Sequence, residues 1–65
     1  MALEEIYRGH RISYQRGGRV ACITRVGSIF ALDVFPTATT AEGLRVLKQR
    51  AYAAVDAELA RRVHP

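Results

Sequence analysis

The sequence predicts an α+β domain in which a three-stranded antiparallel β-meander is packed on one face by a single long C-terminal helix, in the order β-β-β-α. Two observations predict this class. Turn signals divide the first half into three runs of alternating apolar residues, which is the pattern of short strands. From about residue 40 the apolar period changes to that of a helix. The length of 65 residues is enough for one domain only, spanning 1–65.

The strand boundaries follow from glycine and proline. RGGR at 16–19 places two glycines between apolar runs, and glycine reaches the positive φ that a tight hairpin turn requires. Gly27-Ser28 marks a second short turn. Pro36 ends the third run because proline has no amide hydrogen to donate to a strand ladder. The strands are therefore expected at about 6–15, 19–26 and 29–35.

The helix is predicted from about 40 to 62. Thr39 and Glu42 have the spacing of a capping box, in which each side chain bonds the other residue's backbone amide. Arg61 and Arg62 stand at the end where the helix dipole favours cations. One apolar stripe recurs at spacings of three and four residues, at Leu44, Leu47, Ala51, Val55 and Leu59.

Side-chain alternation assigns the two faces of the sheet. By parity, the face against the helix is expected to carry Ile12, Tyr14, Val20, Cys22, Val26, Phe30, Leu32 and Val34. The other face then carries Arg11, Arg19 and Arg25 around an apolar patch, which favours a partner surface. A helix of roughly 33 Å also exceeds a seven-residue strand of roughly 23 Å, so its last turns are expected to project beyond the sheet. A protein interface is predicted at Ile23, Ile29, Phe35, Val55 and Leu59.

A chain this short has a thin core and usually needs a disulfide, a metal or a partner. Cys22 is the single cysteine, so no disulfide forms within the chain. His10, Cys22 and His64 are scattered and show no zinc spacing, so we expect neither a metal nor another cofactor. Oligomerisation remains, and a homodimer is the expected form.

The basic charge favours a polyanion as partner. The chain carries 10 basic and 6 acidic residues, a formal net charge of +4. The region from Tyr7 to Arg25 contains five arginines and no carboxylate. The planar guanidinium suits phosphates and guanine edges, and an arginine-bearing sheet can enter a DNA groove. The expected nucleic-acid contacts are Arg8, Arg11, Arg16, Arg19 and Arg25.

Three short motifs carry a resemblance to a known family: YRG at 7–9 followed by Arg11, GRVACITR at 18–25, and FPTATTAEG at 35–43 before an alanine-rich helix. This pattern resembles that of AP2-type domains and of the related arm-binding domains of phage integrases. The resemblance implies a three-stranded sheet that enters the DNA major groove, with Arg8, Arg11 and Arg25 at DNA-contacting positions. The element order is also similar to that of HicB-type antitoxin modules, which bind a protein partner.

No catalytic arrangement is visible in the sequence. Cys22 is expected to be a buried structural cysteine, His10 a surface or edge histidine, and RGGR lacks the following lysine and helix of a phosphate loop. The leading hypothesis is a non-enzymatic, cytoplasmic, bacterial-looking DNA-binding module, with no membrane span or targeting segment expected. The alternative is a homo-oligomeric or hetero-protein interaction module, antitoxin-like or an assembly domain.

Overall fold

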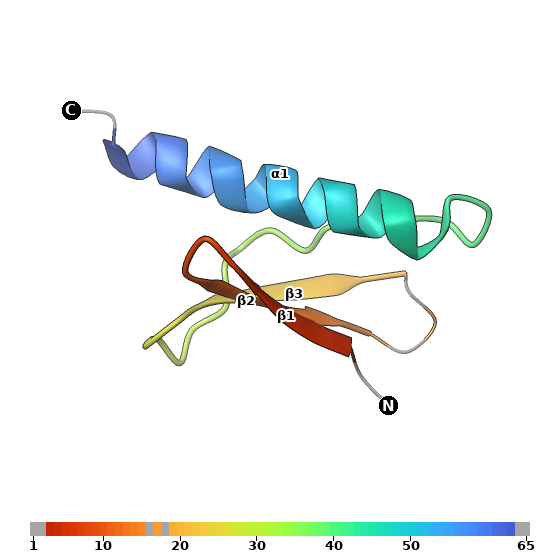
Figure 1. The fold of residues 1–65 in the computed structure, drawn as a ribbon, viewed down its shortest axis with the longest axis horizontal. Helices are drawn as coiled ribbons and strands as arrows, with labels where there is room; N and C mark the ends of the chain where they lie inside the picture. Colours follow the sequence, from red (N-terminus) through yellow and green to blue (C-terminus); the bar gives the residue numbers. More distant parts are fainter. Residues whose placement is uncertain (1–2, 16, 18, 64–65) are drawn as a thin grey trace.

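The structure is a computed structural model that describes residues 3–15, 17 and 19–63. Three strands precede one helix: β1 (Leu3–Tyr7), β2 (His10–Tyr14), β3 (Ala21–Arg25) and α1 (Gly43–Val63). The strands form one antiparallel sheet in the order β1-β2-β3, and α1 lies across one face of it (Figure 1). The predicted α+β class with its β-β-β-α order is confirmed.

The single strand predicted over 6–15 is wrong, because a hairpin turn divides it. Arg8 and Gly9 have φ values of 48° and 79°, so both turn residues occupy the left-handed region. Two consecutive residues with positive φ make the type of two-residue turn whose twist matches the flanking strands. The turn joins β1 to β2 and pairs Tyr7 with His10.

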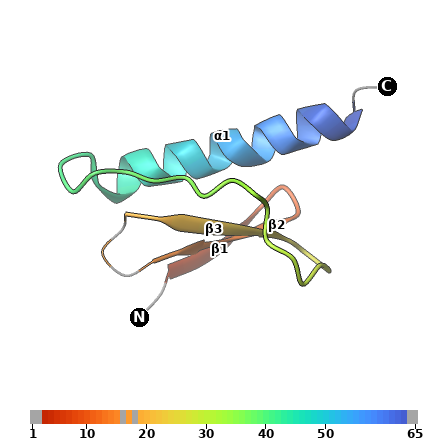
Figure 2. The same cartoon turned by 180° about the vertical axis from the view of Figure 1, so that it is seen from behind.

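The strand predicted over 29–35 is also wrong, although this part of the chain does lie along β3. Only isolated bridges connect the two, Thr24 with Ala31 and Val20 with Thr37. Val20 and Thr24 are four positions apart, whereas Ala31 and Thr37 are six positions apart, so the returning segment has two extra residues between its bridges. Figure 2 shows this segment returning beside β3 before it reaches the start of α1. The strand predicted over 19–26 shortens to β3.

The core lies between the sheet and α1. Cross-strand pairing places Ile12 opposite Ile23 and Tyr14 opposite Ala21, so these four side chains share the face toward the helix. Among the residues that the structure describes, eight apolar ones are buried, namely Ile12, Tyr14, Ala21, Ile23, Ala38, Leu47, Ala51 and Val55.

The predicted facing of β2 is confirmed, and that of β3 is wrong by one residue. Ile12 and Tyr14 are buried as expected. On β3, Ile23 is completely buried, whereas Cys22 is half-buried on the opposite face. Val20 is half-buried, and Val26, Phe30 and Val34 are exposed. Leu32 packs partly against the core, as predicted. A one-residue shift in facing exchanges every side chain of a strand between core and solvent.

The capping box forms, but it precedes the helix instead of starting it. The Thr39 amide donates to Glu42 Oε1 at 2.8 Å, and the Glu42 amide donates to Thr39 Oγ1 at 3.2 Å. Gly43 then has a φ of +79°, which interrupts the helical path. The helix α1 therefore begins at Gly43, three residues later than predicted, and ends at Val63.

The expected projection of the helix is wrong for Val55. This residue is completely buried in the core, and Leu59 packs partly against it. Leu47, Ala51 and Val55 recur at every fourth residue and form the buried line of α1.

Within the described part of the chain, no helix has both the length and the apolar character that crossing a bilayer requires.

Candidate interaction surface

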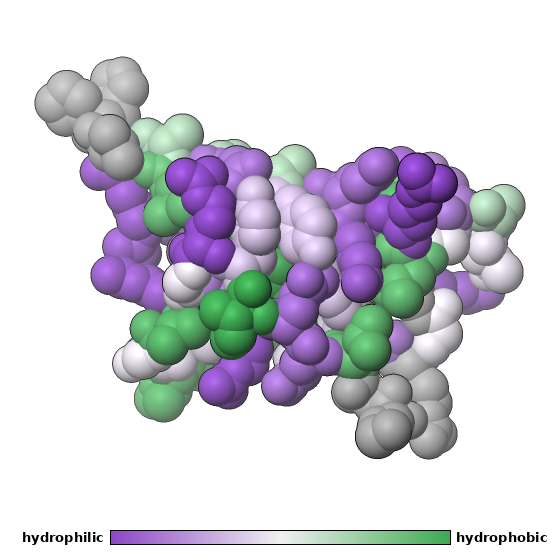
Figure 3. Space-filling model, viewed as in Figure 1, coloured by the Kyte–Doolittle hydropathy of each residue, from purple (hydrophilic) through white to green (hydrophobic). Residues whose placement is uncertain are grey.

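The largest group of exposed apolar side chains lies in residues 26–35, here called the edge segment. Ile29 is 89% exposed and Phe30 is 75% exposed. Val26, Val34 and Phe35 are each 54% exposed. Figure 3 shows apolar surface gathered at the lower left, over the loop that Figure 1 draws in yellow-green. These five residues make up most of the large exposed apolar residues in the described chain.

The edge segment is exposed because few backbone hydrogen bonds hold it to the sheet. The Val26 amide donates to the Gly9 carbonyl at 3.0 Å, and the Leu32 amide donates to the Ile23 carbonyl at 2.8 Å. The next such bond toward the helix is at Pro36, whose carbonyl accepts the Ala21 amide at 2.9 Å. The apolar side chains between these points therefore extend from an irregular backbone instead of a ladder.

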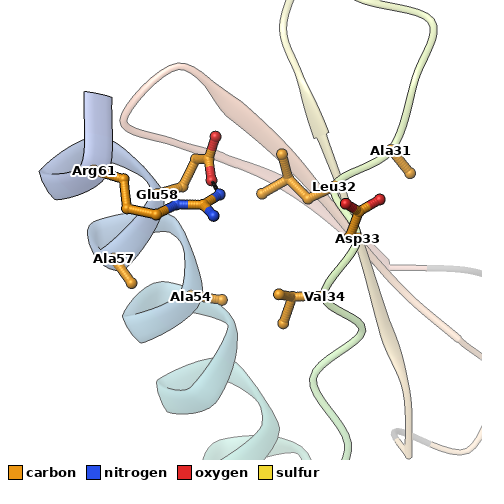
Figure 4. A pocket seen from close by; sticks show the side chains of 8 residues that line it. All are labelled: Ala31, Leu32, Asp33, Val34, Ala54, Ala57, Glu58 and Arg61. Carbon is orange, nitrogen blue, oxygen red and sulfur yellow. Dashed lines mark hydrogen bonds and ion pairs between the residues drawn. The ribbon is translucent and has the colours of Figure 1, made fainter.

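A groove of about 490 Å³ lies between the edge segment and the C-terminal half of α1. In Figure 4, Leu32 and Val34 face Ala54 and Ala57 across it. The alanines leave this space open, because a larger side chain on that side of the helix would fill it. The volume lies in the range of pockets that accept one small ligand or a large side chain.

Charged groups stand at the rim of this groove. Glu58 is bonded to Arg61 and Arg62, and the Arg61 guanidinium holds the pKa of the Glu58 carboxyl below its usual value. Asp33 is exposed and forms no ion pair with any residue of the described chain. The groove therefore combines apolar walls with one unpaired carboxylate.

The structure keeps two of the five predicted interface residues on the surface. Ile29 and Phe35 belong to the exposed edge segment. Ile23 and Val55 are completely buried, so neither can reach a partner. Leu59 is half-buried against the core. The predicted interface residues that stay exposed therefore lie at the edge of the sheet and not on its open face.

The predicted nucleic-acid contacts do not share one face. Arg8 lies in the β1–β2 turn and pairs with Asp56 of α1 at 2.7 Å. Arg19 donates to Thr40 Oγ1 at 2.7 Å, next to the start of the helix. Arg11 is exposed on β2, and Arg25 is exposed at the end of β3. Arg16 lies outside the described residues.

The open face of the sheet is nearly neutral. The register places Ile6, Arg11 and Thr24 in one row across the three strands, and Glu4, Ser13 and Cys22 in the next. Arg11 and Glu4 are its charged members, and Glu4 accepts a hydrogen bond from Ser13. Arg25 shares its parity with Ile23 and thus belongs to the side facing α1.

A tyrosine–carboxylate cluster beside the core was not predicted from the sequence. Tyr14 donates to Glu5 Oε2 at 2.6 Å, and Tyr52 donates to Glu5 Oε1 at 2.7 Å. The Tyr14 bond holds the pKa of Glu5 below its usual value, while burial raises the pKa of Tyr14. Tyr7 stacks on Tyr52 with ring centroids 4.4 Å apart. The cluster ties β1 to α1.

The sequence signal for this cluster is weak, because its members are distant in the chain. Tyr52 lies 47 residues after Glu5. Glu5 has the same strand parity as Leu3 and Tyr7 in β1, and this parity is the one local indication that Glu5 faces the helix. Its partners become apparent only when the helix is placed over the strand.

His10 is buried instead of lying at the surface as predicted. It is 3% exposed, and its Nδ1 lies 3.1 Å from the Arg8 carbonyl. Its Nε2 has no hydrogen-bond partner in the described chain. Among the described residues, no three histidine, cysteine or acidic side chains gather as a set of metal ligands.

Comparisons with family models, with curated proteins and with solved structures give no match. The resemblance to AP2-type and integrase arm-binding domains, and to HicB-type modules, therefore stays a prediction.

Proposed function

We propose that this protein is a small non-enzymatic interaction module that assembles with a second copy of itself through the edge segment. The observation that carries the proposal is the concentration of exposed apolar side chains, from Val26 to Phe35, in one irregular segment beside β3. With five large side chains more than half exposed, this segment presents on the order of 500 Å² of apolar surface. An apolar patch of this size on a soluble protein is often a functional interaction site.

The small core supports the same proposal. Three of its eight buried residues are alanines, which bury little surface. A chain of this size gains stability when a partner covers further apolar area. A stable interface buries about 800 Å² on each partner, so the edge segment would form its apolar centre and the neighbouring polar residues its rim.

The experiment is light scattering coupled to size exclusion over a range of protein concentrations. The wild-type chain is expected to have twice the mass of one chain. Phe35→Asp places a charge on the apolar surface of the edge segment and is expected to give the single-chain mass with an unchanged circular dichroism spectrum. Arg11→Ala, on the open sheet face, is the matched control and is expected to leave the dimer intact. A wild-type chain that stays monomeric at every concentration would refute the proposal.

Nucleic-acid binding is the second candidate function. The observation that favours it is that Arg11, Arg19 and Arg25 form no ion pair within the described chain, in a protein of net charge +4. The test is a gel-shift series with duplex DNA. The logarithm of affinity should fall with the logarithm of salt concentration at a slope of about −0.9 per phosphate contacted. No shift at about 50 mM salt would exclude this candidate.

A further inference from the structure

We infer that the groove between the edge segment and α1 receives the apolar tip of the second copy's edge segment, formed by Ile29 and Phe30. Arg25 of each copy then pairs with Asp33 of the other. This inference rests on the proposed self-association and names the site that would perform it. It depends on the position of the groove, the exposed tip beside it and the charges of Arg25 and Asp33 that flank them.

The tip and the groove are neighbours along the chain. Ile29 and Phe30 are the two most exposed large apolar residues of the described chain, and Ala31 is the first residue that lines the groove. In a two-fold dimer, residue i of one copy contacts residue j of the other and the reverse contact also forms. A two-fold axis close to Phe30 and Ala31 would bring each tip toward the other copy's groove.

The walls of the groove suit an apolar side chain. Leu32 and Val34 stand on one side and Ala54 and Ala57 on the other (Figure 4). The cavity of about 490 Å³ has room for an aromatic side chain together with the residues next to it in the chain. Burying Phe30 there would remove from water a side chain that is 75% exposed in the single chain.

The charges make the surface self-complementary. Arg25 ends β3 at the base of the tip, and Asp33 lies at the groove. Both are exposed, and neither forms an ion pair within the described residues. A surface that carries Arg25 beside its tip and Asp33 beside its groove matches a second copy of itself. Because each copy supplies both charges, the dimer would contain the pair twice.

The first test exchanges the two charges. Arg25→Asp and Asp33→Arg each place like charges opposite one another at two positions of the dimer, so each is expected to raise the dimer dissociation constant tenfold or more. The double variant Arg25→Asp/Asp33→Arg restores opposite charges and is expected to return the constant to within about threefold of wild type. Sedimentation equilibrium measures all four proteins. A double variant as weak as the singles would overturn the inference.

The second test fills the groove. Ala57→Phe occupies the space from the exposed side of α1 and is expected to weaken the dimer tenfold or more while circular dichroism stays unchanged. Ala53→Phe is the matched control, because Ala53 is exposed on the same helix and does not line the groove. Equal dimerisation of the two variants would overturn the inference. If Phe35→Asp still gave a monomer in that case, the proposed function would stand and only the groove would be excluded.

Discussion

At the scale of single residues, Ile23 is the side chain through which the sheet packs against the helix. It is completely buried and lies opposite Ile12 in the strand register, with Leu47, Ala51 and Val55 in the same core. Alternation of apolar residues along β3 favoured Val20 and Cys22 as the inward pair, and the structure reverses this. The pairing of β2 with β3 decides the facing, because it places Ala21 opposite Tyr14 and Ile23 opposite Ile12, and cross-strand partners share a face.

The buried position of Ile23 predicts a clear difference between two conservative substitutions. Ile23→Val removes one methylene group from a closed core and is expected to lower the free energy of unfolding by about 0.5–1.5 kcal/mol. Ile6→Val makes the same change at a residue that is 60% exposed, and its cost should stay below about 0.5 kcal/mol. Urea denaturation of both variants measures the difference. Equal losses would contradict the assigned facing of β3.

Tyr14 and Glu5 show how a buried polar pair escapes prediction from sequence. The Tyr14 ring was expected to face inward and does, but its hydroxyl needs a hydrogen-bond acceptor at that depth. Glu5 supplies one oxygen to Tyr14 and the other to Tyr52 of α1. Nothing near Glu5 in the chain specifies these partners, because both hydroxyls come to it through the pairing of β1 with β2 and the packing of α1.

At the scale of an element, the start of α1 combines a correct local prediction with a wrong boundary. The reciprocal bonds between Thr39 and Glu42 form as their spacing predicted. Arg50, two turns into α1, bonds Glu42 and also donates to the Thr37 carbonyl at 2.8 Å. The Arg50 side chain thus ties the capping turn to the helix. The positive φ of Gly43 interrupts the helical path of the backbone between the two.

This arrangement predicts a pH dependence of folding. The Arg50 guanidinium, with help from the Thr39 amide, lowers the pKa of Glu42 from 4.5 to about 2. A carboxyl whose folded pKa is depressed stabilises the fold above its unfolded pKa and loses that contribution as the pH falls toward the folded value. The contribution of Glu42 is therefore complete above about pH 4.5 and is lost between about 4.5 and 2.

The measurement is the thermal midpoint of wild type and Glu42→Gln as the pH is lowered from neutral to about 2. The midpoint of the variant should be lower at neutral pH and should fall less steeply through this window. Glu5 and Glu58 also have lowered pKa values, so the variant keeps part of the slope. Two curves that run parallel throughout would show that Glu42 does not contribute.

The first hairpin is the element that sequence reasoning missed, and the reason lies in its turn residues. Glycine at position 9 is a usual signal for such a turn, but arginine seldom occupies the left-handed region that Arg8 adopts. The run from Ile6 to Gln15 therefore resembles one continuous strand. The ion pair of Arg8 with Asp56 accompanies this conformation and joins the turn to α1.

At the scale of the whole molecule, the exposed edge segment predicts that stability depends on protein concentration. If two copies cover each other's edge segments, mass action favours the folded dimer as concentration rises. The thermal midpoint of the wild type should therefore increase with concentration. Phe35→Asp should show a lower midpoint that does not change with concentration. Differential scanning calorimetry at several concentrations checks both, and a constant wild-type midpoint would contradict the expectation.

The placement of the arginines also belongs to this scale. Their clustering between residues 8 and 25 suggested one basic face. The fold distributes the four that the structure describes among a turn, the open sheet face, the start of the helix and the end of β3. Linear proximity did not become spatial proximity, because the hairpin turns reverse the chain and strand pairing sends alternate residues to opposite faces.

The sequence by itself determined the class of fold, the order of its elements, the inward facing of Ile12 and Tyr14, the burial of Leu47, Ala51 and Val55 in α1, and the capping turn. Each of these depends on local periodicity or on contacts between near neighbours in the chain. Only the tertiary structure decided the facing of β3, the partners of Glu5, the bulge of the edge segment and the groove beside it. These features depend on strand register and on where the helix lies across the sheet. Both involve contacts between residues far apart in the chain, and no local pattern specifies such contacts.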